Sequence, residues 1–182
     1  MHNIAIWDSY CIEDWMQKGC DKSKAEQINI IMCNCIPHTY IGDKEKGMPK
    51  NINLFVNLQK LFFRYTTIQR LPSQIGMLAN LQILDISYNQ IVELPREIKD
   101  LHNLQHFYCS HNKIKEIPIE IKYLVSMTHF DCSFNEIKII PIEIMECANL
   151  CEIQYSNNNE IYVAPEIHAW LEDYERILDR EF

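Results

Sequence analysis

The chain has 182 residues, enough for one domain with a sizeable core, and 47% of them are apolar, as in globular proteins. Its net charge of −8, with no block of Lys and Arg, argues against binding to nucleic acids or to anionic membranes. No apolar run reaches the ~18 residues of a membrane-spanning helix, and the sequence Met1-His2-Asn3 lacks the basic region of a signal peptide.

Residues 1–24 lack the repeated pattern that fills the rest of the chain. The spacing of the apolar residues between Cys11 and Met16 predicts a helix, which Asp8 or Ser9 can cap. Repeat proteins need a polar covering at each end of the stack. We therefore predict that residues 1–24 form an N-terminal helical cap.

Residues 25–163 repeat one pattern about six times, with a period of 23 residues. Apolar, asparagine, proline and isoleucine sites all follow this period. These sites hold Leu58, Leu81, Leu104, Met127 and Leu150; Asn89, Asn112, Asn135 and Asn158; Pro72, Pro95, Pro118 and Pro141; and Ile75, Ile98, Ile121 and Ile144. The resulting unit, L-x-x-L-x-L-x-x-N, is the signature of a leucine-rich repeat.

Each site in the unit has a structural reason. The alternation of Leu84 and Ile86 with outward-facing residues predicts a strand with one buried face. Asn89 can bond to backbone groups left unpaired where the chain turns, and Pro95 fixes φ at the bend to the outer side. Ile98 suits a short helical or 3₁₀ turn. Because one unit cannot bury its own apolar face, we predict an α/β right-handed solenoid, a horseshoe with a parallel β-sheet on its concave face.

The first coil is irregular. Its three apolar strand sites can be taken by Ala25, Ile28 and Ile30. Cys33 then occupies the asparagine site. Ser23-Lys24-Ala25-Glu26 matches a helix capping box, but we expect a strand after it and so predict no helix there. The interval to Leu58 exceeds the period by ten residues, which predicts an inserted loop at residues 34–47, either a binding loop or a plain surface loop.

From residue 164 the apolar residues follow a helical period. They are Ile167, Trp170, Leu171, Tyr174, Ile177 and Leu178. Glu166 near the start and Arg176 and Arg180 near the end match the dipole of a helix. We predict that residues 164–182 form a C-terminal capping helix.

Outward-facing strand residues should line the concave face, with equivalent residues of neighbouring coils ~4.8 Å apart. At the strand exits, the equivalent residues of successive coils form a column of Tyr65, Tyr88, His111, Phe134 and Asn157. Aromatic and arginine side chains often dominate the binding energy of interfaces. We predict that a protein partner binds the concave residues Phe62, Arg64, Tyr65, Asp85, Tyr88, His106, Tyr108, His111, His129, Asp131 and Phe134.

The extended pattern L-x-x-L-D-I-S-x-N-x-I-x-x-L-P-x-x-I-x-x-L-x-N resembles the 23-residue repeats of the Ras-suppressor-like intracellular leucine-rich proteins, over about residues 25–165. The chain also resembles small leucine-rich repeat proteins of giant DNA viruses that infect amoebae. That resemblance rests on Ile12-Glu13-Asp14-Trp15 and Lys18-Gly19, on the short chain and on its Ile/Asn/Lys-rich usage. The first resemblance implies a non-catalytic protein–protein interaction module, sometimes binding small GTPases or their regulators; the second implies the host cytoplasm.

Two other functions use the same concave residues. His106 and His129 should be adjacent, and with Asp85 and Asp131 they offer ligand types that suit zinc. Ser110, His106 and Asp85 are the residue types of a hydrolase triad. A shallow, wet sheet offers no water-excluded pocket for such chemistry. We therefore predict no catalytic residues, no cofactor and no metal, and keep metal binding or hydrolysis as the alternative.

The cysteines suggest one more metal cluster and a cellular location. Cys33, Cys35 and His38, with Cys20, do not match a standard zinc spacing. Other cysteines stand at apolar sites of the repeat, namely Cys109, Cys132 and Cys147. Such cysteines are small core residues, so we expect a reducing, cytoplasmic location. We also expect a monomer.

The outer side carries a stacked column of acidic residues with lysines nearby, formed by Glu97, Glu120, Glu143, Lys99 and Lys122. We interpret this column as a solvated face, with a basic partner as the alternative.

Overall fold

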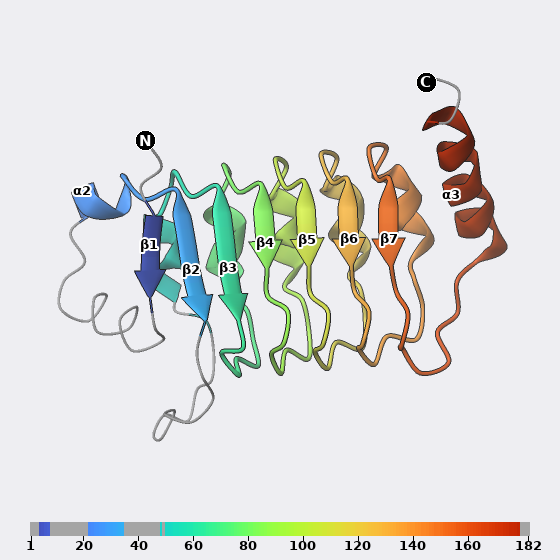
Figure 1. The fold of residues 1–182 in the computed structure, drawn as a ribbon, viewed down its shortest axis with the longest axis horizontal. Helices are drawn as coiled ribbons and strands as arrows, with labels where there is room; N and C mark the ends of the chain where they lie inside the picture. The colour runs from blue at the N-terminus through green and yellow to red at the C-terminus, as the bar shows by residue number, and fades with distance from the viewer. Residues whose placement is uncertain (1–3, 8–21, 35–47, 49, 179–182) are drawn as a thin grey trace.

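The computed structural model describes residues 4–7, 22–34, 48 and 50–178. Within these ranges, seven strands form one sheet in sequence order, and every pair of neighbours is parallel (Figure 1). The strands are β1 (Ile4–Trp7), β2 (Ile30–Asn34), β3 (Lys60–Arg64), β4 (Ile83–Asp85), β5 (His106–Tyr108), β6 (His129–Asp131) and β7 (Glu152–Gln154). The predicted parallel sheet is confirmed.

Five 3₁₀ helices stack behind the strands in the described part of the chain, one in each coil from β2 onward except the last (Figure 1). They are η2 (Lys50–Leu54), η3 (Ser73–Met77), η4 (Arg96–Asp100), η5 (Ile119–Tyr123) and η6 (Ile142–Glu146). The last four each follow a proline in extended conformation, such as Pro95 with φ −70° and ψ 146°. Proline suits this position because the first residues of a helix have no intrahelical acceptor for an N–H group. The predicted 3₁₀ turn on the outer side is confirmed.

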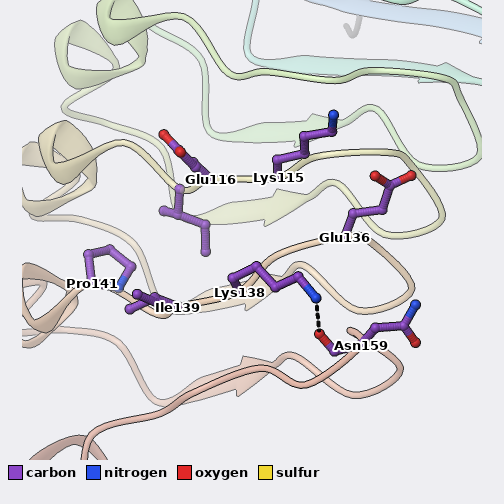
Figure 2. Close-up of a pocket in the computed structure, with 8 residues that line it drawn as sticks. Lys115, Glu116, Glu136, Lys138, Ile139, Pro141 and Asn159 are labelled. Atoms are coloured by element: carbon purple, nitrogen blue, oxygen red, sulfur yellow. Dashed lines mark hydrogen bonds between the residues drawn. The ribbon is translucent and has the colours of Figure 1, made fainter.

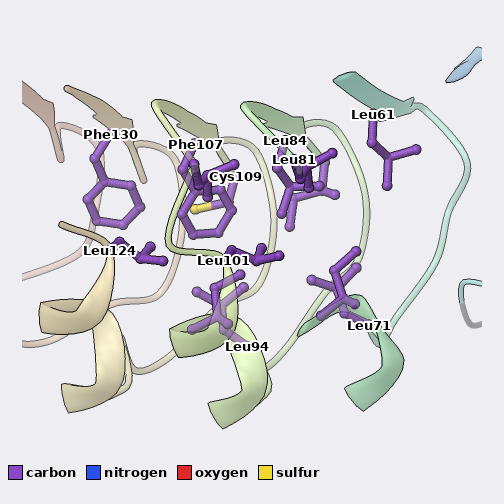
Figure 3. Close-up of a cluster of buried hydrophobic side chains, with 14 of the residues drawn as sticks. Leu61, Leu71, Leu81, Leu84, Leu94, Leu101, Phe107, Cys109, Leu124 and Phe130 are labelled. Carbon is purple, nitrogen blue, oxygen red and sulfur yellow. The ribbon is translucent and has the colours of Figure 1, made fainter. Parts of the chain in front are cut away.

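The core lies between the sheet and the 3₁₀ helices (Figure 3). Leu84 and Ile86 enter it from a strand, and Ile98 enters from the opposite side; all three are fully buried. Phe107 and Phe130 of adjacent coils stack with ring centroids 5.4 Å apart. Burial of each such side chain contributes about 1.5–3 kcal/mol, and the contact between coils is what makes the burial possible.

The turn after each of the strands β4 to β7 contains a buried asparagine. These residues form an asparagine ladder, which consists of Asn89, Asn112, Asn135 and Asn158. The Nδ2 of Asn112 donates to the carbonyls of Ile86, Cys109 and Ser110, and its Oδ1 accepts the N–H of Ile91. Asn135 repeats all four bonds one coil later. Buried backbone groups at the turn are thus paired, as burial requires.

Thr66 stands at the asparagine site of the coil before Asn89. Its backbone N–H and its Oγ1 both donate to Asn89 Oδ1, at 3.0 and 2.8 Å. A threonine hydroxyl is short and has one proton, whereas an asparagine amide has two. Thr66 therefore contributes to the ladder as a donor to the side-chain amide oxygen of Asn89 in the next coil.

The N-terminal region differs from the prediction of a helical cap over residues 1–24. Residues Ile4–Trp7 form β1, which pairs with β2 in parallel, Ile4 opposite Ile30. The sheet therefore includes a strand ahead of the predicted repeats. Its short sequence, Ile4-Ala5-Ile6-Trp7, alternates without an asparagine or proline site to mark it. The helix predicted between Cys11 and Met16 lies outside the described residues.

The register of the first predicted coil was also wrong. Ile31 pairs with Leu61 and Cys33 with Phe63, so Cys33 stands in a buried strand column and not at the asparagine site. The spacing L-x-x-L-x-L fits both Ala25-Ile28-Ile30 and Ile28-Ile31-Cys33, and only the second treats cysteine as a core residue.

The residues around this first coil show two further differences. Lys22–Ala25 forms a short helix, α2, where we predicted none, and Lys22 pairs with Glu26 across one turn. Asn34, predicted to start the inserted loop 34–47, belongs to β2, whereas residues 35–47 lie outside the described part of the chain.

At the C-terminal end, Pro165–Leu178 forms helix α3, which lies beyond β7 (Figure 1). Proline is favoured in the first turn of a helix, and Pro165 begins α3, one residue after the site at which the earlier prolines precede 3₁₀ helices. Ile167 is fully buried, and Trp170 and Leu171 pack against the core. The helix contacts η6 and so covers part of the last coil's apolar side.

Candidate functional site

The sheet register brings the predicted concave residues together. His106 pairs with His129, and Tyr108 pairs with Asp85 on one side and Asp131 on the other. Three of the predicted residues are exposed, namely Tyr65, Tyr88 and Phe134, and one is buried, Asp85. The others are half-buried: Phe62, Arg64, His106, Tyr108, His111, His129 and Asp131. Phe62 lies beside Met32 in the column of Asp85 and Tyr108, not among the aromatic residues at the strand exits.

The strand exits carry an aromatic ladder, which we define as Tyr65, Tyr88, His111 and Phe134. Consecutive ring centroids are 4.5, 4.2 and 4.1 Å apart, and the ring planes are inclined by 23°, 10° and 11°. Tyr65, Tyr88 and Phe134 keep 43%, 37% and 45% of their surface exposed. Stacked pairs of this kind contribute about 0.5–1.5 kcal/mol each beyond the area that they bury.

Every residue of the aromatic ladder has a left-handed backbone. The φ angles of Tyr65, Tyr88, His111 and Phe134 are 56°, 58°, 54° and 52°. Asn157, the fifth residue of the column, has φ 57° and is of a type that tolerates this conformation. For the aromatic residues the conformation costs about 1–3 kcal/mol each. The sequence contained one signal of it, the asparagine in an otherwise aromatic column.

Arg64 lies against the first two rings of the aromatic ladder. Its guanidinium carbon is 5.5 Å from the ring centroid of Tyr65 and 5.4 Å from that of Tyr88. Its Nε is 3.6 Å from Asp85 Oδ2, an ion pair longer than a hydrogen bond. Asp85 Oδ1 accepts the backbone N–H of Ser87 at 3.0 Å. The arginine therefore joins the carboxylate column to the aromatic ladder.

A histidine pair occupies the other side of the sheet face. The rings of His106 and His129 lie 4.7 Å apart. His129 contacts Thr128 through Nδ1 at 2.9 Å and Glu152 through Nε2 at 3.7 Å. Tyr108 lies with its hydroxyl 3.4 Å from His106 Nδ1.

Burial, then the neighbouring charges of His129 and Lys60, lower the pKa of His106. Burial also raises the pKa of Tyr108, with the carboxylates of Asp85, Glu152 and Asp131 adding to the effect. The centre of the face therefore disfavours a cation on His106 and an anion on Tyr108.

The structure does not assemble the alternative hydrolase triad. His106 and Ser110 lie four residues apart on one extended chain, a span of about 13 Å. Ser110 Oγ donates to Ser87 Oγ, and Asp85 faces Arg64, so each candidate has a different neighbour. The sequence contains the three residue types of a triad, but the spacing of His106 and Ser110 along one extended segment keeps their side chains apart.

No group of three His, Cys, Asp or Glu side chains within the described ranges is arranged to hold a metal ion. His106 and His129 are adjacent, but Asp85 and Asp131 are separated from each other by the coil of Tyr108. For the second metal cluster, Cys33 is a buried strand residue, whereas Cys20, Cys35 and His38 lie outside the described residues.

A hollow that the sequence analysis missed lies between strand exits and 3₁₀ helices of the later coils (Figure 2). Its volume is about 700 Å³, with Ile117, Ile139 and Pro141 among its apolar lining and charged residues at its rim. Lys138 Nζ donates to the Asn159 carbonyl at 3.0 Å. Ile139 is 59% exposed and stands where earlier coils have glutamate, which was the available sequence signal.

The acidic column on the outer side is paired in part. Arg96 lies 3.8 Å from Glu120, and Lys122 lies 3.6 Å from Glu146. Exposed pairs of this kind contribute little to stability, as expected of a solvated face.

Among the residues that the structure describes, no helix is both long and apolar enough to cross a membrane.

Comparison with known proteins agrees with the repeat geometry. The family model described as a leucine-rich repeat region matches residues 35–133, more than half of the chain. No curated protein matches the chain.

Among solved structures, a leucine-rich repeat protein of Leptospira interrogans is 29% identical, with a TM-score of 0.69, over 83% of this chain and 37% of that chain. The plant peptide hormone receptor RGFR1, in complex with RGF2, is 20% identical, with a TM-score of 0.55, over 71% of this chain and 24% of that one. The internalin inlF of Listeria monocytogenes is 16% identical, with a TM-score of 0.57, over 79% of this chain and 43% of that one.

This chain therefore spans less than half the length of each of these three. The leucine-rich repeat fold is typical of protein-interaction modules and generally non-enzymatic. On its repeat geometry and on the family match, the chain belongs to the leucine-rich repeat family.

Proposed function

We propose that the chain is a non-catalytic protein-interaction module whose partner docks on the exposed sheet face, across the aromatic ladder and the polar columns beside it. The observation that carries the proposal is the ladder itself. It holds the exposed rings of Tyr65, Tyr88 and Phe134 in one stack with His111, on a backbone conformation that is unfavourable for such residues.

Stacking gives these rings a specific advantage for binding. A side chain held between two neighbours has already lost much of its rotational freedom, so little more is lost when a partner arrives. Aromatic side chains also bury large areas and are enriched among the residues that dominate binding energy. The aromatic ladder is therefore a preorganised docking surface.

The similarity to solved interaction proteins supports the class of function. The receptor RGFR1 is in complex with RGF2, and its repeats share the fold of this chain. From the sequence resemblance, a small GTPase or a signalling regulator is a candidate partner, and the cytoplasm, of a host cell if the chain is viral, is the proposed location. Size measurement by light scattering at two concentrations tests the proposed monomer.

Affinity capture from cytosol, followed by mass spectrometry, tests the proposal. The variant to use combines Tyr88→Asn, Tyr108→Ala and Phe134→Asn, because asparagine already occupies this left-handed column at Asn157. The matched control changes three exposed residues of the outer side to alanine.

The control residues are Ile119, Tyr123 and Ile142, which are 57%, 46% and 47% exposed. We expect a specific partner to be captured by the wild type and by the control, and lost from the sheet-face variant with an unchanged circular dichroism spectrum. Capture that survives in the sheet-face variant but is lost in the control would place the interaction on the other side.

A further inference from the structure

The sheet face contains the same local arrangement twice, two coils apart. In the first copy, Asp85 stands beside the stacked rings of Tyr65 and Tyr88. In the second copy, Asp131 stands in the Asp85 column, and His111 and Phe134 take the places of the two tyrosines. The intervening coil has Tyr108 at the carboxylate position, so the two copies are separate.

The two copies agree in detail. Asp85 Oδ1 accepts the N–H of Ser87 at 3.0 Å, and Asp131 Oδ1 accepts the N–H of Ser133 at the same distance. The rings of His111 and Phe134 stack at 4.1 Å and 11°, closer and flatter than the 4.5 Å and 23° of the first copy. All four ring residues have φ between 52° and 58°.

Besides the ring residues, the copies differ in two ways. In the second, Ser133 Oγ also donates to Asp131 Oδ1, at 2.6 Å. The larger difference is at the residue before the first ring. The first contains Arg64, whose guanidinium lies against both tyrosine rings and pairs with Asp85. The equivalent residue of the second copy is Ser110, whose short side chain donates to Ser87 Oγ at 3.3 Å. Among the described residues, no Lys or Arg pairs with Asp131 or lies over His111 or Phe134.

The charge near the second copy is negative. Glu152 lies on β7 opposite His129, in the column next to that of Asp131, and Asp131 itself is half-buried. The pKa of Tyr108, raised first by burial, is also raised by Asp85, Glu152 and Asp131, which agrees with a negative potential there. A cation arriving from outside would meet the Asp131 carboxylate, which attracts it, and could lie beside the rings of His111 and Phe134 as Arg64 lies beside the two tyrosines.

We propose that Asp131, His111 and Phe134 form a receptor site for an arginine side chain of the partner protein, in the place that Arg64 fills in the first copy. This inference rests on the proposed function, because it names the chemistry of a partner residue on the same face. Arginine fits better than lysine because its planar guanidinium can lie against rings while it pairs with a carboxylate, as Arg64 does.

An amide NMR titration of the full chain tests the site with a small probe. The probe is Nα-acetyl-arginine amide, and Nα-acetyl-citrulline amide is the control of nearly equal shape without the charge. We expect the arginine probe to shift the amide signals of Ser133 and Phe134, and the citrulline probe to leave them in place.

Three variants make the test specific. Ser110→Arg supplies an internal arginine and should abolish the shifts. Asp131→Asn keeps an acceptor for the Ser133 N–H but removes the charge, and should weaken binding of the probe by roughly tenfold. Arg64→Ser empties the first copy and should create a new shift at Ser87.

Equal shifts with arginine and citrulline, or full shifts retained in both Ser110→Arg and Asp131→Asn, would overturn the inference. If Ser110→Arg does not fold, Asp131→Asn and Arg64→Ser decide the matter. Specific capture of a partner by the sheet face without arginine-dependent shifts refutes this site and leaves the proposed function standing. Arginine-dependent shifts without any protein bound to the sheet face support the site and refute the proposed function.

Discussion

Tyr88 and His111 stack with their ring centroids 4.2 Å apart and their planes 10° from parallel, although both have φ above 50°. The left-handed conformation costs free energy for a side chain with a Cβ, and stacking on two sides offsets part of this cost. The conformation also orients every residue of the aromatic ladder in the same way, because each strand exit turns identically. Backbone strain and ring stacking are therefore two parts of one feature.

Substitution of Tyr88 should separate these two parts. Tyr88→Ala loses stacking on Tyr65 and His111 and keeps a residue that disfavours the left-handed backbone, so we expect unfolding free energy to fall by about 1–3 kcal/mol. Tyr88→Asn loses the same stacking but tolerates the backbone, and should be less destabilised. Urea denaturation measures both values. Equal stability of the two variants would mean that the conformation carries no cost here.

The asparagine ladder should tolerate substitution poorly. Asn112→Ala removes three donated bonds and leaves the buried Ile91 N–H without its acceptor, so we expect a loss of about 3 kcal/mol or more. The control is Asn103→Ala on the outer side, which removes one exposed bond to the Ala79 carbonyl and should cost about 1 kcal/mol or less. Thermal denaturation measures the stability of both variants. An equal fall in their two midpoint temperatures would contradict this prediction.

Gly76 in η3 lies close to the next coil. A Cβ at Gly76 would lie 2.5 Å from the carbonyl oxygen of Glu97, a contact with backbone that cannot move aside easily. We expect Gly76→Ala to lower unfolding free energy by about 1–3 kcal/mol through this overlap. Lys99→Ala, at the equivalent site of η4, is the control and should change stability little. An unchanged stability of Gly76→Ala would show that the coils can separate at no cost.

His106 should titrate at lower pH than an ordinary histidine, because burial and then the charges of His129 and Lys60 lower its pKa. His129→Gln removes one of these charges and should raise the pKa of His106. The unfolded chain binds the proton of His106 more readily than the folded chain does, so unfolding free energy should fall as pH drops below about 6.5. NMR titration of the imidazole signals measures the pKa; a value unchanged by His129→Gln contradicts the coupling.

The core cysteines should resist alkylation until the chain unfolds. Burial raises the pKa of Cys147 to about 12 and raises those of Cys109 and Cys132 as well. Since the thiolate is the reactive form, iodoacetamide at pH 8 should label these residues roughly a hundredfold or more slowly in the native protein than in urea. Peptide mass spectrometry quantifies each site, with half-buried Cys151 as an internal comparison. Rapid native labelling of Cys132 would contradict its burial.

The repeated part of the fold could be predicted from sequence because many residues carry the same information. The coils that begin at Leu81, Leu104 and Met127 each have their own asparagine and their own buried strand pair, and the period places them in register. The outward columns followed from the alternation of a strand. The period of 23 residues predicts that Asp85, Tyr108 and Asp131 share one column, and the sheet register confirms this. Their role in binding stays a prediction.

The irregular parts could not be predicted in the same way. At β1 a four-residue strand has no marker residues, and at β2 two registers satisfy the same apolar spacing. The left-handed conformation of Tyr65, Tyr88 and Phe134 is uncommon for aromatic residues, so their backbone preferences predict a different conformation. The ion pair of Arg64 with Asp85 depends on how far the arginine side chain extends from one coil to the next, which a pattern of spacings does not specify.

The direction of the asparagine bonds has a consequence for how such a chain can change in length. Asn112 and Asn135 each form hydrogen bonds with backbone groups of the preceding coil. The buried backbone groups of one coil are therefore paired by the asparagine of the next coil. Gain or loss of one whole 23-residue unit rejoins equivalent partners on both sides of the junction, whereas a shorter or longer change leaves an amide facing the wrong backbone group. Among the coils that carry the asparagine ladder, variation in size between relatives of this chain should therefore come in whole coils.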